Sequence, residues 1–428
     1  MKIYNNPDKK DWNEILRRPA MDNASLEKAV GKILKSVKEK GDKAVRKYSK
    51  EFDGVSLRKL QVSDKEIKDA EKLLSDELKQ AIRQAASNIR LFHEKQTNPV
   101  EIIETMPGVQ CWRKSIGIEK VGLYIPGGTA PLFSTILMLG IPATIAQCNE
   151  IILCTPPSPQ GEGRGEVHPA ILYTANLIGI SKIFKAGGVQ AIAAMAYGTE
   201  SIPQVYKIFG PGNQYVTCAK QLVQKDGIAI DMPAGPSEVA VYADETAVPS
   251  FVAADLLSQA EHGADSQVVL VGSSELVVGR VQEELILQLN ALPRKEFAEK
   301  ALENSKAIVV KGESEAIELL NEYAAEHLIL SCANADAVAE KIINAGSIFL
   351  GNYSPESVGD YASGTNHTLP TNGYAKAYSG VSVDSFVKKI TYQKLSEEGL
   401  KNISDTVIAM AEAEGLEGHA EAVRIRKG

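Results

Sequence analysis

The chain has 428 residues, of which 44% are hydrophobic and 24% charged, a composition typical of soluble globular proteins and a length that predicts more than one domain. The 47 Lys and Arg residues against 54 Asp and Glu residues give a net charge of −7 without a long basic run, so neither a nucleic acid nor a membrane surface is an expected partner. Five scattered cysteines without a CxxC pair indicate a reducing compartment, and the first residues lack the apolar core of a signal peptide, so we expect a cytoplasmic protein.

The N-terminal part of the chain is charged and has the periodicity of helices, most clearly between residues 24 and 98. The residue pattern changes at Val121, where short runs that contain β-branched residues replace the charged, helix-periodic sequence. We therefore predict a helical N-terminal region over residues 1–120.

The stretch from Val121 to Asn149 carries no charge and is long enough to span a bilayer. Four glycines and three prolines interrupt it, namely Pro126, Pro131 and Pro142. We predict a strand, a glycine turn and a buried helix there, rather than a membrane span.

Strand-like and helix-like segments alternate from Val121 onwards, which predicts an α/β fold with parallel sheets and helices on their faces. About ten strands favour two Rossmann-like domains, over residues 121–236 and 237–380, followed by a helical C-terminal arm over residues 381–428. The Pro/Gly-rich segment 156–167 is interpreted as a solvated surface loop without an assigned role. The strand-like runs are VGLYIPG, EIILCTP, KIFKAGG, IAIDMPAG, EVAVYAD, SQVVLVGS, AIVVKG, HLILSC and GSIFLGN.

Two glycine-rich turns, within residues 185–198 and 207–220, each follow a predicted strand and open a predicted helix. Backbone N–H groups at such helix starts bind anions. Neither turn has the GxGxxG spacing, and no acidic residue follows about twenty positions later, so the turns alone are a weak signal for a dinucleotide.

Gln259 and His262 are three residues apart at the end of a predicted helix, so their side chains share one face. An imidazole and an amide oxygen could ligate a divalent ion. The stretch is equally well explained as an ordinary helix C-terminus before Gly263.

The tripeptide Ala-Glu-His of residues 260–262 recurs at 325–327, where Glu326 and His327 are expected to close a helix and lead into a strand. Adjacent side chains point in different directions, so this pair cannot share one metal face. The two residues could serve one pocket, with His327 as a base and Glu326 as the activator of a water molecule. The alternative is a histidine favoured by the dipole at a helix C-terminus.

Two further polar clusters contain Asp360 with His367, in the loop 358–371, and Glu414 with His419, at a helix break within 411–422. Such a loop can carry function or be a simple turn, and a lone histidine on a terminal helix is usually solvated. Two imidazoles, a carboxylate and an amide suit Zn²⁺ or a similar ion. Spacing alone does not show that Gln259, His262, Asp360 and His419 converge.

The motifs, taken together and in order, resemble those of the histidinol dehydrogenase family. The similarity runs from about residue 121 to 423, and the helical N-terminal region also fits. The segment 156–167 is longer than the turn usual in that family. The matching segments are VGLYIPGGTAPLFST, AGGVQAIAAMAYGT, KIFGPGNQYV, DMPAGPSEV, LLSQAEHGADSQV, EHLIL, GDYASGTNHTLPT and EGLEGHAEAV.

The resemblance implies NAD-dependent oxidation of L-histidinol through L-histidinal to L-histidine with two NAD⁺, the final steps of histidine biosynthesis. It implies one zinc ion per subunit, and it makes Glu326 and His327 the general bases. The zinc ligands would be Gln259, His262, Asp360 and His419.

The resemblance also implies a homodimer whose C-terminal arms cross, so that Glu414 and His419 would serve the partner's active site. The NAD contacts would be Tyr124, Gln190 and Asn213. The substrate contacts would be Ser237, Gln259, His262, His327, Asp360, His367, Glu414 and His419.

Two other functions and one other mechanism are alternatives to this oxidation, and each would use different chemistry. A zinc hydrolase could use the same ligands with Glu326 as its base, but would form no NADH from histidinol. A protein with structural zinc would bind the metal without turnover, although its ligands would normally be rich in cysteine and lie in one subunit. A cysteine thiohemiacetal route is disfavoured, because none of the five cysteines lies in a Gly-rich polar turn next to a base.

Overall fold

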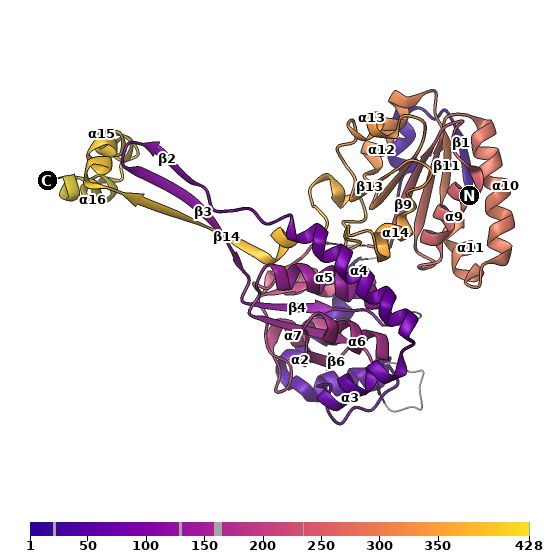
Figure 1. Ribbon diagram of the computed structural model, residues 1–428, viewed down its shortest axis with the longest axis horizontal. Helices are drawn as coiled ribbons and strands as arrows, with labels where there is room; N and C mark the ends of the chain where they lie inside the picture. The colour runs from indigo at the N-terminus through magenta and orange to yellow at the C-terminus, as the bar shows by residue number, and fades with distance from the viewer. Residues whose placement is uncertain (20–22, 128–130, 158–164, 234, 428) are drawn as a thin grey trace.

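The computed structural model describes residues 1–19, 23–127, 131–157, 165–233 and 235–427. It contains two parallel sheets, each covered by helices on both faces, and a long arm that extends away from them (Figure 1). The predicted α/β class with two Rossmann-like sheets is therefore confirmed.

The first sheet has five parallel strands in the spatial order β6-β5-β4-β7-β8. Numbered along the chain, this is the order 3-2-1-4-5 of a Rossmann unit, in which the direction of winding reverses between β4 and β7. The strands are β4 (Lys120–Tyr124), β5 (Glu150–Thr155), β6 (Lys182–Lys185), β7 (Lys207–Phe209) and β8 (Ala229–Ile230).

Alternate residues of these strands enter two separate cores, because successive side chains of a strand point to opposite faces. Ile152 and Cys154 pack on one face and Leu153 on the other. One face is covered by α2 (Asn23–Phe52), α7 (Gly188–Tyr197) and α8 (Gln214–Lys225). The other is covered by α3 (Asp64–Ala70), α4 (Asp76–Glu94), α5 (Phe133–Ile145) and α6 (Pro169–Leu177).

The charge-free stretch 121–149 forms β4 and the buried helix α5, as predicted. Within the ranges that the structure describes, no helix is long and apolar enough to cross a membrane.

The second sheet has six parallel strands in the order β1-β11-β10-β9-β12-β13, and its last five again follow the order 3-2-1-4-5. The strands are β1 (Lys2–Asn5), β9 (Glu238–Ala243), β10 (Gln267–Gly272), β11 (Lys306–Val309), β12 (His327–Ser331) and β13 (Ser347–Leu350). One face packs on α1 (Trp12–Ile15), α12 (Glu313–Tyr323) and α13 (Ala335–Ala339). The other packs on α9 (Pro249–Ala260), α10 (Glu275–Ala291) and α11 (Lys295–Glu303).

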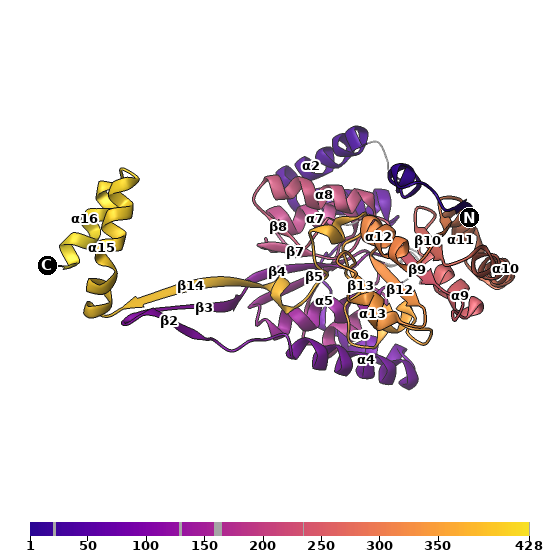
Figure 2. The ribbon, with the colours of Figure 1, turned by 90° about the horizontal axis from the view of Figure 1, so that it is seen from above.

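The arm is a three-stranded antiparallel sheet that ends in two helices, and these lie far from both parallel sheets (Figures 1 and 2). Its strands come from opposite ends of the chain and include a stacked pair of rings, Trp112 and Tyr392, with centroids 5.4 Å apart. The elements are β2 (Ile102–Met106), β3 (Val109–Gly117), β14 (Val387–Leu395), α15 (Glu397–Ala413) and α16 (Glu417–Lys427).

Residues 1–120 are thus distributed differently from the single helical region expected. The strand β1 joins the second sheet, α2 to α4 cover the first, and β2 with β3 belongs to the arm. The arm also contains the strand β14, which the helical prediction for 381–428 did not include. These strands pair with segments hundreds of residues away or lie in solvent, so no local apolar pattern marks them.

The remaining elements are short. They are α14 (Glu356–Tyr361) and the 3₁₀ turns η1 (Lys9–Asp11), η2 (Glu71–Leu73), η3 (Tyr374–Lys376) and η4 (Val383–Phe386).

Candidate active site

A pocket of about 240 Å³ lies between the two parallel sheets. The first sheet contributes the turns that follow β4, β7 and β8, whereas the second contributes the segments that precede β9, β10 and β12. The carboxyl edge of the first sheet therefore meets the amino edge of the second. A ligand here would contact the place between β4 and β7 at which Rossmann units bind dinucleotides.

The turn after β7 is held in place by a buried ion pair between Lys220 and Asp231. Lys220 Nζ donates to the backbone oxygen of Gly210 at 2.9 Å, and Asp231 Oδ2 accepts from the Gly210 N–H at 2.8 Å. A side chain at residue 210 would lie 2.1 Å from the backbone oxygen of Tyr124, so glycine is required. Asn213 then caps α8 by accepting two backbone N–H bonds at 3.1 Å.

The other two expected dinucleotide contacts lie beneath the start of α7. The hydroxyl of Tyr124 accepts a hydrogen bond from the Gly188 N–H at 3.1 Å, and burial raises the pKa of Tyr124 to about 12. Gln190 is buried, and its Oε1 has no partner among the described residues. Asn213 lines the pocket, whereas Tyr124 and Gln190 are not among the described residues that line it.

We expected Glu326 and His327 to close a helix, but the structure places them elsewhere. Helix α12 ends at Tyr323, Ala324 adopts a left-handed conformation (φ 53°), and His327 is the first residue of β12. The interpretation of His327 as a residue favoured by a helix C-terminus is therefore wrong. The strand fixes its direction instead, in register with Val239 of β9.

These two side chains form a buried pair at the amino edge of the second sheet. Glu326 Oε2 accepts from the Glu238 N–H at 3.0 Å and lies 3.7 Å from Nδ1 of His327. Burial raises the pKa of Glu326, and the neighbouring imidazole only partly opposes this. Burial alone would lower the pKa of His327, but Glu326 and Asp360 outweigh it and raise that pKa. The pair can therefore hold and transfer a proton.

The first residue of β9, Glu238, donates its N–H to Glu326, and Arg18 of the N-terminal segment fixes the position of Glu238. Arg18 forms an ion pair with the buried carboxylate of Glu238 and donates to the backbone oxygen of Tyr323 at 2.6 Å. Its guanidinium also stacks over the Tyr323 ring at 4.1 Å. Arg18 thereby neutralises the buried charge of Glu238 next to the Glu326 carboxylate.

Asp360 approaches His327 from helix α14, with its Oδ1 3.2 Å from Nε2 of the imidazole. Neither atom makes a hydrogen bond within the described structure, so the contact is one of charge. Burial would raise the pKa of Asp360, but His327 lowers it below its usual value.

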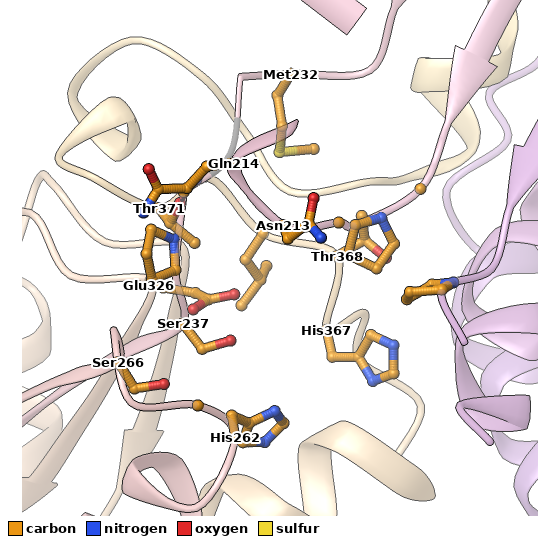
Figure 3. A pocket seen from close by; sticks show the side chains of 18 of the residues that line it. Asn213, Gln214, Met232, Ser237, His262, Ser266, Glu326, His367, Thr368 and Thr371 are labelled. Carbon is orange, nitrogen blue, oxygen red and sulfur yellow. Dashed lines mark hydrogen bonds between the residues drawn. The ribbon is translucent and has the colours of Figure 1, made fainter. Parts of the chain in front are cut away.

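His367 lines the same pocket as Ser237, His262 and Glu326 (Figure 3). Its Nδ1 lies 2.8 Å from the backbone oxygen of Asp360, so Nδ1 carries the hydrogen. Its Nε2 then accepts from the hydroxyl of Thr135 at 3.0 Å. Burial lowers the pKa of His367, which keeps the ring neutral.

Gln259 lies in the last turn of α9 and His262 just beyond it, where the His262 backbone N–H donates to the backbone oxygen of Gln259 at 3.3 Å. When the Gln259 amide is oriented to satisfy both of its ends, Nε2 donates to Glu356 Oε1 at 2.9 Å. Its Oε1 then accepts from the Glu238 N–H at 3.1 Å. Glu356 was not among the predicted site residues.

Glu414 and His419 do not reach the pocket of their own chain. Both are exposed at the far end of the arm, where Glu414 directly follows α15 and His419 lies in the first turn of α16 (Figures 1 and 2 show these helices). Among the residues that the structure describes, no group of three or more His, Cys, Asp and Glu is arranged to hold a metal ion. His262 and Asp360 are close enough for the Asp360 charge to oppose the lowering of the His262 pKa by burial, and Gln259 lies three residues before His262 at the end of α9. Their oxygen and nitrogen donors are of the kinds that zinc binds.

Three comparisons with known proteins give the same family over nearly the whole chain. The sequence model described as histidinol dehydrogenase matches residues 16–427. The chain is 61% identical to the histidinol dehydrogenase of Bacteroides thetaiotaomicron, covering 100% of this chain and 99% of the relative. It is 49% identical to that of Escherichia coli, covering 97% and 96%. The crystal structure of histidinol dehydrogenase from Elizabethkingia anophelis superposes with a TM-score of 0.96 at 55% identity, covering 100% of this chain and 98% of the other.

Proposed function

The chain belongs to the histidinol dehydrogenase family, and on that premise we propose that it oxidises L-histidinol through L-histidinal to L-histidine with two NAD⁺. The observation that carries the proposal is the buried pair of Glu326 and His327. It stands at the amino edge of one sheet, opposite the dinucleotide-type edge of the other. A proton acceptor and a hydride acceptor can thus reach one substrate from two sides.

His327 acts as the base in the first oxidation in its deprotonated form, which alkaline pH favours because Glu326 and Asp360 raise its pKa. It takes the hydroxyl proton of the alcohol while hydride leaves, and the neighbouring Glu326 and Asp360 carboxylates stabilise the imidazolium that forms. In the second oxidation Glu326 accepts a proton from the water that adds to the aldehyde. His327, which has released its first proton to solvent, then takes a hydroxyl proton of the resulting hydrate while the second hydride leaves for the second NAD⁺. Glu326 lines the pocket and His327 lies directly beside it, so the two groups can serve the same bound substrate in turn.

The zinc ion would be held by Gln259, His262 and Asp360 of one chain and His419 of its partner. When bound, zinc supplies a Lewis acid that fixes the imidazole and amine of the substrate. Ser237 and His367, which line the pocket, would contact the substrate, together with Glu414 of the partner chain. Tyr124, Gln190 and Asn213 would contact NAD⁺, supported by their position around the starts of α7 and α8.

A homodimer with crossed arms would complete this site. Its support is the exposure of Glu414 and His419 at the far end of the arm, with apolar side chains exposed on the same arm. These apolar residues are Ile102, Ile103, Met410, Leu416 and Ile425. We expect the enzyme in the cytoplasm, where its five free cysteines would stay reduced.

The test is the stoichiometry of NADH formed when purified, zinc-loaded protein converts a limiting amount of histidinol. We expect two NADH per histidinol and histidine as the product. A hydrolase with the same ligands would form no NADH, and an ordinary alcohol dehydrogenase would stop at one. None of the five cysteines lines the pocket, so alkylation of the thiols should leave the stoichiometry unchanged.

A further inference from the structure

Glu356 is a buried carboxylate for which the proposed chemistry gives no role. Its side chain is 1% exposed, and its Oε2 makes no hydrogen bond with any described residue. A buried polar atom without a partner is costly, so a residue that retains one calls for an explanation. Glu356 is the first residue of α14, and Asp360 lies one turn further along this helix.

The other carboxylate oxygen has two partners. Oε1 of Glu356 accepts from the hydroxyl of Ser258 at 2.7 Å and from Nε2 of Gln259 at 2.9 Å. An amide nitrogen can only donate and the carboxylate oxygen accepts, so the amino end of the Gln259 side chain must face Glu356. The carbonyl end is then turned to the Glu238 N–H, on the side where Glu326 lies. The reverse orientation would place two acceptors against each other.

We propose that Glu356 is a positioning residue that holds the nitrogen end of the Gln259 amide, so that the carbonyl oxygen, which keeps a second lone pair beside the one that accepts from the Glu238 N–H, is the end left for the proposed metal ion. Only that oxygen can ligate a metal ion, because the amide nitrogen has no free electron pair for it. The short helix α14 thereby sets two ligands at once, Asp360 directly and Gln259 through Glu356. This inference rests on the proposed zinc site and adds a residue to it.

The role depends on the reach of the side chain rather than on its charge, and a pair of variants separates the two. Glu356→Gln keeps the length and offers a carbonyl oxygen that can accept the same two hydrogen bonds. Glu356→Asp keeps the charge but is one methylene shorter, which withdraws the acceptor from Gln259. Loss of a group that orients a metal ligand typically weakens metal binding about 10–100-fold.

The measurement is the zinc dissociation constant of the full-length protein, by competition with a chromophoric chelator. The visible spectrum of the Co²⁺-substituted protein reports the ligand geometry independently of activity. We expect Glu356→Asp to bind zinc about 10–100-fold more weakly with an altered Co²⁺ spectrum, and Glu356→Gln to resemble the wild type. Glu340→Gln is the control, because Glu340 is an exposed carboxylate that does not line the pocket. It should leave both readouts unchanged.

Two results would overturn the inference while leaving the proposed function intact. In one, Glu356→Asp binds zinc as tightly as the wild type. In the other, Glu356→Gln loses as much affinity as Glu356→Asp, which would indicate a role of charge. If the wild-type protein itself binds no zinc, the proposed metal site fails and the inference fails with it. Circular dichroism of each variant establishes that it is folded.

Discussion

Glu326 and Gln259 accept hydrogen bonds from the same backbone group, the N–H of Glu238, and this places a base next to a candidate metal ligand. The two Ala-Glu-His tripeptides that contain or border these residues adopt different structures. The first stands where helix α9 ends, and the second opens strand β12. Identical neighbours in sequence do not impose one conformation, because tertiary packing decides where a helix stops.

Replacement of Glu326 by glutamine should separate the two oxidation steps. The variant keeps the size of the side chain but loses the carboxylate that accepts a proton from water. Oxidation of histidinal should therefore fall about 10²–10⁴-fold, and more than oxidation of histidinol. Steady-state kinetics with each substrate measure this, and Glu340→Gln, an exposed glutamate beyond the site, serves as the control. Equal losses in both reactions would point to a shared positioning role instead.

Sequence alone supplied candidate residues for the site but not their arrangement. Spacing left open whether Gln259, His262 and Asp360 converge, and the resemblance supplied them as a set. Glu356 gave no signal, because a glutamate after proline at the start of a helix is usually an exposed first-turn carboxylate. Its burial follows from the docking of α14 on α9, which no local pattern encodes.

At the scale of elements, the central strands were predicted because parallel strands buried on both faces are near-continuous apolar runs. The β-branched run of residues 238–243, for example, is β9 and is buried throughout. The end of α12 was misplaced because Ala324 takes the left-handed position that glycine or asparagine usually fills. The arm strands were missed because β2 is exposed along its whole length.

The ion pair beneath the turn after β7 should matter for both stability and dinucleotide binding. Lys220→Met leaves the Asp231 carboxylate buried without its partner, which typically costs about 3–5 kcal/mol. It also removes the bond to Gly210 that shapes the turn, so the KM for NAD⁺ should rise.

Chemical denaturation and initial-rate kinetics test this prediction together. The control is Lys401→Met, which removes an exposed ion pair with Glu397 on the arm helix α15 and should change stability little. A Lys220→Met variant as stable as the wild type would show that Asp231 is compensated by another group or by water.

At the scale of the whole molecule, the two Rossmann-like sheets contribute opposite edges to the pocket: the first its carboxyl edge and the second its amino edge. At the carboxyl edge of the second sheet Asp244 links the segments that follow β9 and β12, since it accepts from the Ala333 N–H at 3.0 Å and from the Thr246 N–H at 2.8 Å. The pocket lies instead at the amino edge of that sheet. Fold class alone would therefore have directed a search for the proposed catalytic pair, Glu326 and His327, to the other edge of the sheet.

Completion of the site by a second chain is the claim on which the proposed mechanism most depends. In an isologous dimer, a chain that carries His327→Ala still donates an intact arm, and a chain that carries His419→Ala still provides an intact pocket. One site of the heterodimer then collects both defects and the other collects none. With random pairing and two inactive parents, about a quarter of wild-type activity should return.

The decisive measurement is histidinol-dependent NADH formation after exchange of subunits between these two inactive variants, with exchange verified by mass. The proposed account predicts that activity rises from the parental background towards about a quarter of the wild-type value. Verified exchange without any gain in activity would show that His419 acts within its own chain or outside the site, and would contradict the crossed arm.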